Sequence, residues 1–379
     1  MRIGIEAQRL FRPKKHGMDM VALEIIRHIQ LIDKDNDYFI YIKPDIDICL
    51  QESSNVTIRL VKGHSYPTWE QIELPRAVKK DRCQLLHCTS NTAPIFSPVP
   101  LVLTLHDIIF FEKSYWNTIF GKGTSYQKFG NVYRKLIVPF NLKSVKTLIT
   151  VSKFEQEHIS AFLKLSINSI HVVYNGVGDH FKKIDDDVEK NNFKKEYNLP
   201  DSFLFFMGNT DPKKNTIGVL KAYSILRKNI SIPLVMIDYP KDELMQMCSE
   251  IGDTDLYKHI HLTGYIQNSK LPLLFSLCTL FLYPSLRESF GIPIIEGQAC
   301  GVAVITSNTS SMPEIGGEGA IFVDPLNSQE IANVIFNLLS DSKKVEELIE
   351  LGLKNAPRFS WTESAKEMIR LYRSTILNS

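Results

Sequence analysis

From residue 280 to residue 301 the chain reads LFLYPSLRESFGIPIIEGQACG, and this stretch decides the fold. The apolar run 280–284 predicts the end of a buried strand. The segment 292–300 is apolar on one side and is followed by Gly301, which predicts a helix that stops there. Glu288 then lies in the strand-to-helix loop, and Glu296 lies about one turn into the helix. In an open α/β sheet, ligands bind at such loops, beyond the carboxyl ends of the strands.

The residues around the two glutamates suit a ligand that carries phosphate and hydroxyl groups. Ser289, Phe290 and Gly291 place backbone N–H groups at the predicted helix start, which favours an anion such as a diphosphate. A carboxylate beside them can accept hydrogen bonds from sugar hydroxyls. Acidic residues placed at a helix start by its dipole are the structural alternative. Two glutamates eight positions apart are common by chance, so the specificity comes from the whole string 287–301.

This string resembles the E-x7-E motif of retaining glycosyltransferases of family 4, including its mannosyltransferase-like members. The resemblance implies a GT-B fold, an α/β architecture in which two Rossmann-like domains face each other across a cleft. It also implies that the donor, a nucleotide-diphosphate sugar, binds mainly to the C-terminal domain. In this chain the backbone of 290–292, which ends at Ile292, would bind the diphosphate. Glu288 would bind sugar hydroxyls, and Glu296 would bind the ribose.

Alternating β-rich and helical patterns run along the whole chain and predict parallel sheets covered by helices on both faces. The strands are expected at 2–6, 38–42, 56–61, 85–88, 101–106, 147–151, 170–174, 203–207, 234–237, 259–262, 280–283, 302–305 and 320–323. The helices are expected at 18–32, 69–78, 125–138, 153–163, 214–227, 242–251, 271–277, 293–300, 328–339, 343–353 and 361–377.

The charged stretch 182–195 interrupts this alternation and is the predicted linker. We therefore expect an N-terminal, acceptor-binding domain at 1–181 and a C-terminal, donor-binding domain at 182–360. The segment 361–379 is expected to form an amphipathic helix. The resemblance implies that this helix packs back on the N-terminal domain.

A second candidate phosphate site follows the predicted strand 203–207. Its residues are Gly208, Asn209, Asp211 and Lys214, and a lysine at a helix start adds its charge to the backbone dipoles. The order of strand, glycine and lysine resembles the phosphate-binding turn of the family, although Asn209 stands where the family has arginine. A solvated helix start capped by Asp211 is the alternative.

His106 ends the apolar strand 101–106, and Asp107 is expected to cap or orient the next loop. The pair resembles the His-Asp pair of the family, which implies that His106 contacts the donor sugar near the reacting carbon. A structural histidine is the alternative. With Glu288 and Lys214, His106 completes the candidate catalytic residues.

Two further loops are weaker candidates for donor contacts. The turn after the first strand is basic and keeps only Gly17, where the family often has two adjacent glycines near the donor phosphate. The loop at Ile266 corresponds to the one that receives the nucleotide base in the family, and the nearby Asn268 fits guanine or uracil. A surface loop and a structural turn are the respective alternatives.

Composition is that of an ordinary globular protein, with 44% hydrophobic and 23% charged residues. No apolar run is long enough for a transmembrane helix. The six scattered cysteines show no C-x-x-C pair, which favours a reduced, cytoplasmic protein without a zinc site. No D-x-D carboxylate cluster occurs in a suitable loop, so we expect no metal and no cofactor.

The stretch Lys113–Phe154 carries eight basic residues, no acidic residue and several interleaved aromatic residues. Such a segment fits a membrane interface with anionic lipid, and it predicts reversible docking on the inner face of the cell membrane. A solvated basic face with its aromatic residues in the core is the alternative. No recognised nucleic-acid-binding module accompanies the charge, so we expect no nucleic acid partner.

Together these features predict a metal-independent, retaining hexosyltransferase. Its donor would be GDP-mannose or a UDP-sugar, and its acceptor a glycan or a lipid-linked acceptor in surface polysaccharide biosynthesis. We find no enzymic nucleophile by sequence. This favours a reaction in which the acceptor attacks the sugar on the same face from which the leaving group departs. A catalytically inactive nucleotide-sugar-binding subunit and a sugar-nucleotide epimerase on the same fold remain the alternatives.

Overall fold

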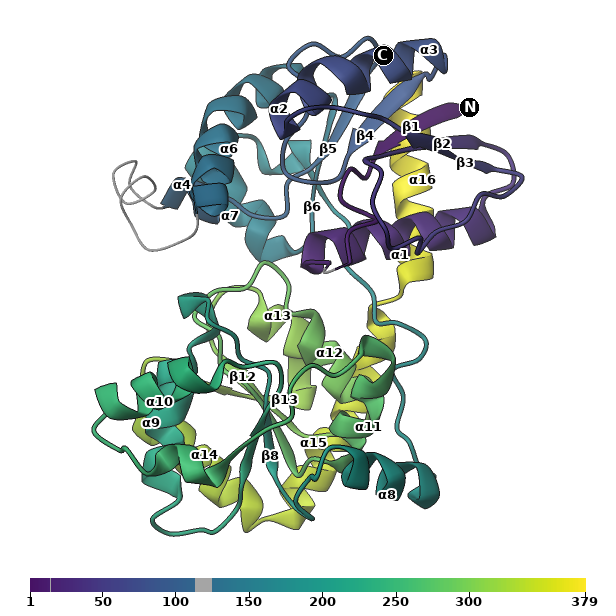
Figure 1. Ribbon diagram of the computed structural model, residues 1–379. Coiled ribbons are helices and arrows are strands. Elements are labelled where there is room, and N and C mark those ends of the chain that lie inside the picture. Colours follow the sequence, from purple (N-terminus) through teal and green to yellow (C-terminus); the bar gives the residue numbers. More distant parts are fainter. Residues whose placement is uncertain (14, 113–124) are drawn as a thin grey trace. The chain divides into compact units, whose positions relative to one another are not determined.

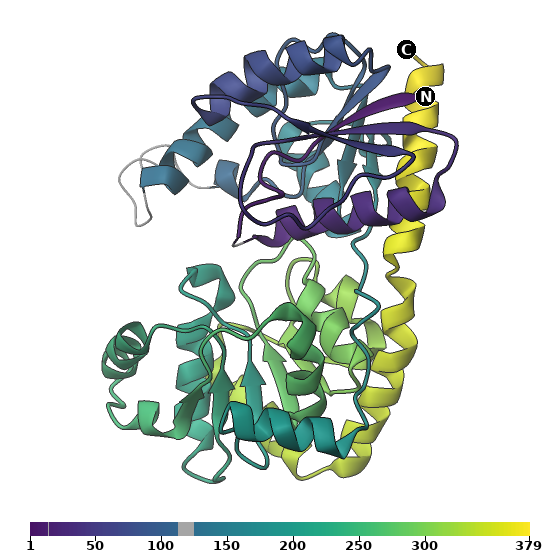
Figure 2. The ribbon, with the colours of Figure 1, turned by 45° about the vertical axis from the view of Figure 1, so that its right-hand side comes forward.

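The computed structural model describes residues 1–13, 15–112 and 125–379, with the side chains of 125–128 left undescribed. The chain forms two compact units. Unit 1 comprises 1–175 and 361–379, and unit 2 comprises 176–360. Each unit contains one parallel sheet covered by helices (Figures 1 and 2), which confirms the predicted α/β class.

The sheet of unit 1 has seven strands in the order β3-β2-β1-β4-β5-β6-β7. Its strands are β1 Arg2–Glu6, β2 Asp37–Ile42, β3 Val56–Leu60, β4 Leu85–Cys88, β5 Leu101–Thr104, β6 Thr147–Thr150 and β7 Ile170–Val172. Its helices are α1 Gly17–Ile32, α2 Tyr66–Thr68, the π-helix η1 Trp69–Glu73, α3 Leu74–Lys80, α4 Ile109–Glu112, α6 Ser125–Ser144, α7 Lys153–Leu163, η2 Ile167–Ser169 and α16 Trp361–Leu377.

The sheet of unit 2 has six strands in the order β10-β9-β8-β11-β12-β13. They are β8 Leu204–Phe206, β9 Leu234–Met236, β10 Ile260–Leu262, β11 Leu280–Tyr283, β12 Val304–Ser307 and β13 Ala320–Val323. The helices are α8 Asp187–Glu196, η3 Pro212–Lys214, α9 Thr216–Leu226, α10 Lys241–Glu250, η4 Leu256–His259, η5 Asn268–Lys270, α11 Leu271–Leu277, α12 Ile292–Ala299, α13 Met312–Gly316, η6 Gly317–Gly319, α14 Ser328–Leu339, α15 Ser342–Asn355 and η7 Ala356–Arg358.

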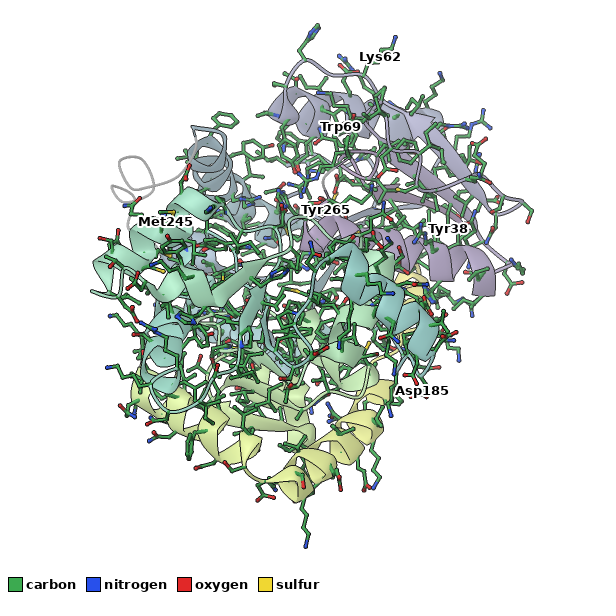
Figure 3. All side chains as sticks on the ribbon, turned by 60° about the horizontal axis from the view of Figure 1, so that its bottom comes forward. Tyr38, Lys62, Trp69, Asp185, Met245 and Tyr265 are labelled. Atoms are coloured by element: carbon green, nitrogen blue, oxygen red, sulfur yellow. The ribbon has the colours of Figure 1, made fainter. Side chains whose placement is uncertain are left out.

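The central strands are rich in apolar residues because helices cover both faces of each sheet. Every residue of β4, β5, β8 and β11 is buried. In unit 1, Trp69 is 1% exposed inside the core, whereas Lys62 projects outward (Figure 3). Among the described residues, no helix combines the length and apolarity needed to cross a bilayer.

Helix α16 lies against unit 1, where it contacts α1 (Figure 2). The hydroxyl of its Tyr372 lies 2.7 Å from His87 Nδ1 on β4, and Thr375 Oγ1 lies 2.6 Å from Thr147 Oγ1 on β6. These contacts reach buried polar groups of the sheet, so the last helix completes the core of unit 1.

The predicted linker 182–195 is wrong in detail, because residues 187–196 form α8. Asp186 caps this helix by accepting hydrogen bonds from Val188 N and Glu189 N at 2.8 and 3.0 Å. Phe193 anchors it with 2% exposure. Capping and one buried aromatic residue therefore stabilise a helix in a segment whose charge alone suggests a loop. The division between the units falls earlier, between Asn175 and Gly176.

Candidate functional site

The structure brings Lys214 and Glu288 together at the carboxyl ends of β8 and β11, which are neighbours in the sheet. Lys214 Nζ lies 2.6 Å from Glu288 Oε1 and donates a second hydrogen bond of 2.6 Å to the hydroxyl of Tyr283. Glu288 is 7% exposed and Tyr283 is 1% exposed. Two residues that are 74 positions apart thus form one partly buried ion pair with a tyrosine beside it.

Burial would raise the pKa of Glu288, but the charges of Lys214 and Lys213 outweigh it and hold the pKa below its usual range. Glu288 is therefore an anion at neutral pH. Its carboxylate has more acceptor positions than Lys214 occupies, so it can also accept hydrogen bonds from hydroxyl groups.

A short turn places Lys214. The turn η3 is capped by Asp211, which accepts a hydrogen bond from Lys213 N at 3.1 Å, a cap that the sequence offered as part of the structural alternative. Asn215 follows in the left-handed region with φ 59°, and α9 begins after it rather than at Lys214. The Asn215 amide donates to the carbonyls of Pro284 and Pro325, at 3.0 and 2.7 Å. These bonds tie the lysine turn to the loops that follow β11 and β13.

The loop from Glu288 to Gly291 is fixed by serines from the next strand-to-helix loop. Ser310 Oγ accepts from Glu288 N at 3.1 Å, and Ser311 Oγ donates to the carbonyls of Glu288 and Phe290. Gly291 precedes α12 with φ 97°, a backbone conformation that strongly favours glycine. The loop therefore enters the helix without a capping side chain at that position.

Glu296 lies in the middle of α12, as predicted, and is 9% exposed. Burial raises its pKa to about 8, so the side chain is a neutral carboxylic acid at pH 7. A neutral carboxyl group can both donate and accept a hydrogen bond. This combination suits a diol such as that of ribose.

The remaining candidates of unit 2 lie on its strand-end loops. Gly208 is buried, and a Cβ there would collide with the ring of Phe206. Asn209 is exposed, and its Oδ1 accepts from Asp211 N at 2.8 Å. Ile266 is 3% exposed beside the exposed Tyr265 (Figure 3). The Asn268 side chain lies 2.8 Å from His180 Nε2, so that amide already has a partner inside unit 2.

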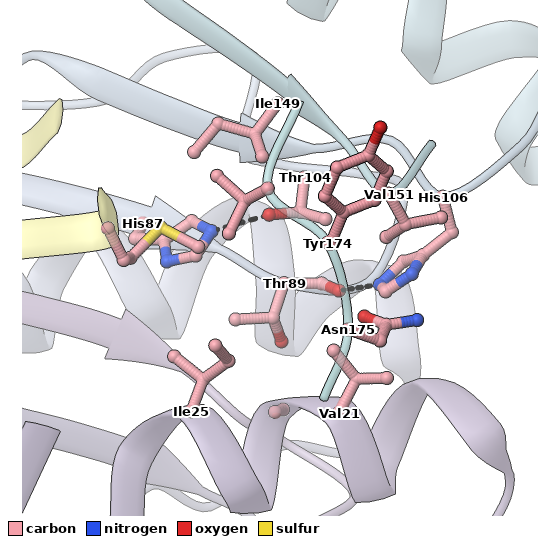
Figure 4. Close-up of a pocket in the computed structure, with 13 residues that line it drawn as sticks. Val21, Ile25, His87, Thr89, Thr104, His106, Ile149, Val151, Tyr174 and Asn175 are labelled. Atoms are coloured by element: carbon pink, nitrogen blue, oxygen red, sulfur yellow. Dashed lines mark hydrogen bonds between the residues drawn. The ribbon is translucent and has the colours of Figure 1, made fainter. Parts of the chain in front are cut away.

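In unit 1, His106 lies just beyond β5, which ends at Thr104 rather than at the predicted residue 106. His106 is 5% exposed, and its Nε2 lies 2.9 Å from the carbonyl oxygen of Thr89 (Figure 4). The two histidines His87 and His106 line one small pocket. Burial lowers the pKa of both, to about 3 for His87. Asp107 Oδ1 accepts from Ile109 N at 3.1 Å, which is the loop-orienting contact expected of it.

Two arginines of the basic loop after β1 pair with one carboxylate, while Lys15 of the same loop pairs with Asp47. Arg9 Nε lies 3.2 Å from Asp19 Oδ1, and Arg12 also pairs with Asp19. His16 N donates to the same carboxylate at 2.8 Å. Gly17 starts α1, and a Cβ at this position would meet no atom within 4 Å. The loop is thus organised by an aspartate rather than by a glycine pair.

Sequence reasoning missed three residues that shape these sites: Tyr283, Asn215 and Asp19. Tyr283 ends an apolar strand, and no role was predicted for its hydroxyl. Asn215 follows two lysines directly, and its role depends on tertiary hydrogen bonds to the carbonyls of Pro284 and Pro325. A polar residue at a predicted strand end was the available signal for Tyr283.

Over the described part of the chain, no three His, Cys, Asp or Glu side chains are grouped to hold a metal ion.

Two family models match the chain and together account for most of both units. The model of Glycosyltransferase Family 4 matches residues 40–180, and that of Glycosyl transferases group 1 matches residues 187–355. The chain therefore belongs to the glycosyltransferases of the family 4 type, as the motif at Glu288 and Glu296 suggested.

Several relatives are mannosyltransferases by name. The chain is 30% identical over 224 residues to the serotype-specific mannosyltransferase WbdA of Escherichia coli, covering 58% of this chain and 27% of that protein. It is 32% identical over 175 residues to the O-antigen chain mannosyltransferase B of E. coli, covering 45% of each. The O-antigen chain mannosyltransferase RfbU of Salmonella typhimurium is 24% identical, covering 77% of this chain and 74% of RfbU. The chain thus spans less than half the length of the two E. coli relatives.

Solved structures share the architecture. Anabaena Alr3699/HepE in complex with UDP-glucose aligns with a TM-score of 0.75 at 18% identity, over 99% of this chain and 100% of that one. WaaG, a glycosyltransferase involved in lipopolysaccharide biosynthesis, aligns with a TM-score of 0.71 at 13% identity, over 97% and 98% of the two chains. At these identities the likeness concerns the fold, which is GT-B.

Proposed function

We propose that this protein transfers a hexosyl group from a nucleotide-diphosphate sugar to a glycan or a lipid-linked acceptor, with retention of configuration. The observation that carries the proposal is the partly buried pair of Lys214 and Glu288 beside the start of α12. A cation and a helix N-terminus suit a departing diphosphate, and the adjacent carboxylate suits sugar hydroxyls. Membership of the family and the names of the relatives support a role in the synthesis of surface polysaccharide such as O-antigen.

In the proposed reaction, the bond between the anomeric carbon and the diphosphate oxygen breaks while a bond from an acceptor hydroxyl forms on the same face. The acceptor proton passes to the departing phosphate oxygen. Lys214 and the N–H groups at the start of α12, around Ile292, stabilise the charge on the leaving diphosphate. Ser289, Phe290 and Gly291 supply the backbone of this cradle. Positioned charge of this kind contributes about 3–4 kcal/mol per donor in comparable sites.

The donor is proposed as GDP-mannose or a UDP-sugar. The relatives named as mannosyltransferases favour mannose. Ile266 and its loop would receive the base, and Glu296 the ribose. A thermal-shift screen against GDP-mannose, UDP-glucose and ADP-glucose tests this, because a ligand at about 100 times its Kd adds about 2.7 kcal/mol of stability. Stabilisation by none of these sugars would contradict the proposal.

Transfer assays with the stabilising donor separate the enzyme from its alternatives. A product that carries the labelled hexose on a glycan or lipid acceptor supports the transferase. Conversion of the donor to a second nucleotide sugar without an acceptor would instead indicate an epimerase. Binding without either reaction, under conditions that support a related transferase, would indicate an inactive subunit.

We also propose that unit 1 docks on an anionic membrane surface through the exposed face of α6. Phe129, Leu136 and Phe140 recur at helical spacing on this face, with exposures of 56, 55 and 52%. Lys143 lies beside them, with its Nζ 5.9 Å from the Phe140 ring centroid. The exposed aromatic and aliphatic side chains suit the lipid interface, and the lysines suit anionic headgroups.

Other side chains of α6 are tied to the core of unit 1. Tyr133 donates a 2.6 Å hydrogen bond to the fully buried Glu70, and the Asn141 amide donates to the carbonyl of Ala93. Tyr133, one turn after Phe129, is half-buried and bonded to Glu70, whereas Phe129 and Phe140 are exposed. The aromatic residues of this helix therefore divide between the two interpretations. The earlier part of the predicted basic segment, 113–124, lies outside the described residues.

Sedimentation with vesicles tests the docking surface. We expect binding to vesicles with anionic lipid at low salt, less binding at high salt, and loss of binding when Phe140→Ser is combined with Lys143→Glu. Charge reversal at the exposed Lys79 and Lys80 of α3 is the matched control and should have no effect. Equal binding of both variants, or no binding at low salt, would remove the membrane proposal.

A further inference from the structure

The loop after β4 holds His106 at two points. β4 and β5 are parallel neighbours, so the residues that follow them meet at the same edge of the sheet. Thr89 and Asn91 come from the β4 loop and His106 from the β5 loop. All three are buried, with exposures of 6, 3 and 5%. This edge belongs to unit 1 alone, and its geometry does not depend on unit 2.

The first point of attachment is the backbone of His106. His106 N donates a 2.7 Å hydrogen bond to the side-chain Oδ1 of Asn91. Asn91 N in turn donates to the carbonyl of Thr104 at 3.1 Å, at the end of β5. Asn91 adopts φ 68°, a left-handed conformation that asparagine tolerates better than most residues. Asn91 therefore bridges the end of β5 and the residue two positions beyond it.

The second point is the imidazole ring. His106 Nε2 lies 2.9 Å from the carbonyl oxygen of Thr89, and a carbonyl only accepts (Figure 4). Nε2 must therefore carry a proton. Thr89 is itself fixed, because its Oγ1 donates to the carbonyl of Glu6 at 2.8 Å. Burial lowers the pKa of His106 and favours the neutral ring. In a neutral ring with Nε2–H, Nδ1 is an acceptor.

We propose that Asn91 is a positioning residue that, with the Thr89 carbonyl, holds His106 as an acceptor for a hydroxyl group of the sugar. This inference rests on the proposed function. The chemistry follows from the tautomer: an unprotonated Nδ1 accepts a hydrogen bond from a hydroxyl and cannot donate one to a phosphate. His106 therefore binds an uncharged group of the ligand that donates a hydrogen bond. The ion pair of unit 2 supplies the charge for the diphosphate.

Three variants of Asn91 separate the hydrogen bond from the backbone conformation. Asn91→Gly keeps the left-handed backbone and removes the acceptor, Asn91→Ala removes the acceptor and strains the backbone, and Asn91→Asp keeps the acceptor. We expect kcat/KM for transfer to fall about 10-fold in the glycine and alanine variants, because the histidine loses its anchor. Asn198→Ala is the matched control. Asn198 has φ 50° in an exposed turn, and its substitution should leave transfer unchanged.

The aspartate variant should shift the pH dependence of transfer, an effect that loss of the fold cannot produce. Its carboxylate near His106 raises the pKa of the imidazole. Transfer should then recover at alkaline pH and fall on acidification, so the acidic limb of the pH profile moves to higher pH than in the wild type. An unmoved acidic limb would contradict a role for Asn91 acting through His106.

Nitrogen-15 NMR of the imidazole shows which tautomer is present and does not depend on activity. The signals of the His106 ring are assigned by their absence from the spectrum of His106→Gln. We expect the neutral Nε2–H form at pH 7. A protonated Nδ1, or Asn91→Gly with wild-type kcat/KM, would overturn this inference while leaving the transferase assignment intact. Absence of transfer by the wild type with every donor would instead count against the proposed function, and the NMR result would still decide the geometry of His106.

Discussion

The carboxyl ends of the two sheets hold their central side chains in different ways. In unit 1, His106 is fixed by uncharged groups, the amide oxygen of Asn91 and the carbonyl of Thr89. In unit 2, Lys214 is fixed by the carboxylate of Glu288 and the hydroxyl of Tyr283. The first arrangement is set by the loops before any ligand arrives. The second is set by charge, so an incoming anion would compete with Glu288 for the ammonium group of Lys214.

Under the proposed function, this difference would divide the work between neutral recognition in unit 1 and charged recognition in unit 2. The Lys214 ammonium has three N–H donors, and Glu288 and Tyr283 occupy two of them. A diphosphate can take the third and then compete for the others. Release of Glu288 would free its carboxylate for sugar hydroxyls. Unit 1 needs no such exchange, because the Nδ1 acceptor of a neutral His106 is already formed.

The largest effect should follow from removal of the charge in unit 2. We expect Lys214→Met to lower kcat/KM by about 100- to 1,000-fold, because the leaving diphosphate loses its positioned cation. Transfer kinetics with the preferred donor measure this. Lys258→Met is the matched control, since Lys258 pairs with Asp255 at 2.6 Å on the exposed surface of the same unit. Near-normal transfer in Lys214→Met would show that unit 2 does not depend on this charge.

A double variant separates chemistry from stability. Lys214→Met leaves Glu288 buried without its cation, which costs about 3–5 kcal/mol in comparable pairs. Glu288→Gln in the same chain removes the unpaired charge and should restore the melting temperature without restoring transfer. Recovery of transfer along with stability would mean that the pair is structural.

Much of the fold was predictable because both faces of each sheet are covered. Apolar runs such as Leu280–Tyr283 have one structural interpretation, and the observed strand agrees with it to the residue. The ends of several other strands differ by a residue or two, since the last residues of a run are decided by neighbouring strands. Helix α8 was missed because its stability comes from capping by Asp186 and burial of Phe193, which a charge count does not show.

The site was predictable in its outline and not in its contacts. The order of strand, glycine and lysine placed Lys214 near the loop of Glu288, and the structure puts them 2.6 Å apart. The hydroxyl of Tyr283 and the amides of Asn91 and Asn215 act through tertiary hydrogen bonds. The position of Tyr283 at a predicted strand end is the one local signal among them. The raised pKa of Glu296 depends on burial by distant segments and could not be predicted from its position in the helix.

A smaller effect should distinguish the two carboxylates of unit 2. The pKa of Glu296 is about 8 in the folded protein against an ordinary value of 4.5. The folded state therefore holds a proton that the unfolded state has lost, so Glu296 makes stability fall as the pH rises from about 4.5 to about 8. Glu296→Gln should remove this part of the pH dependence. Melting temperatures at pH 6 and pH 8.5 test it.

The comparison with Glu288 sharpens the result. The charge of Lys214 holds the pKa of Glu288 low, so Glu288 is already ionised across the same pH range and contributes little to its slope. Glu288→Gln should leave the slope between pH 6 and pH 8.5 as in the wild type. If Glu296→Gln and the wild type lose stability in parallel, Glu296 is ionised in the folded protein and both carboxylates of unit 2 are charged.

The smallest effect is expected from removal of divalent cations. In the proposed mechanism, Lys214 and the N–H groups at the start of α12 supply the positive charge at the leaving diphosphate, a task that metal ions perform in other enzymes. Transfer by the wild type should therefore proceed at the same rate with EDTA as without it, and Mg²⁺ or Mn²⁺ should not rescue Lys214→Met. Loss of wild-type transfer in EDTA with recovery on addition of Mg²⁺ would contradict this. The charge of unit 2 would then be shared between Lys214 and an ion, and the contrast with the neutral site of unit 1 would no longer depend on protein groups alone.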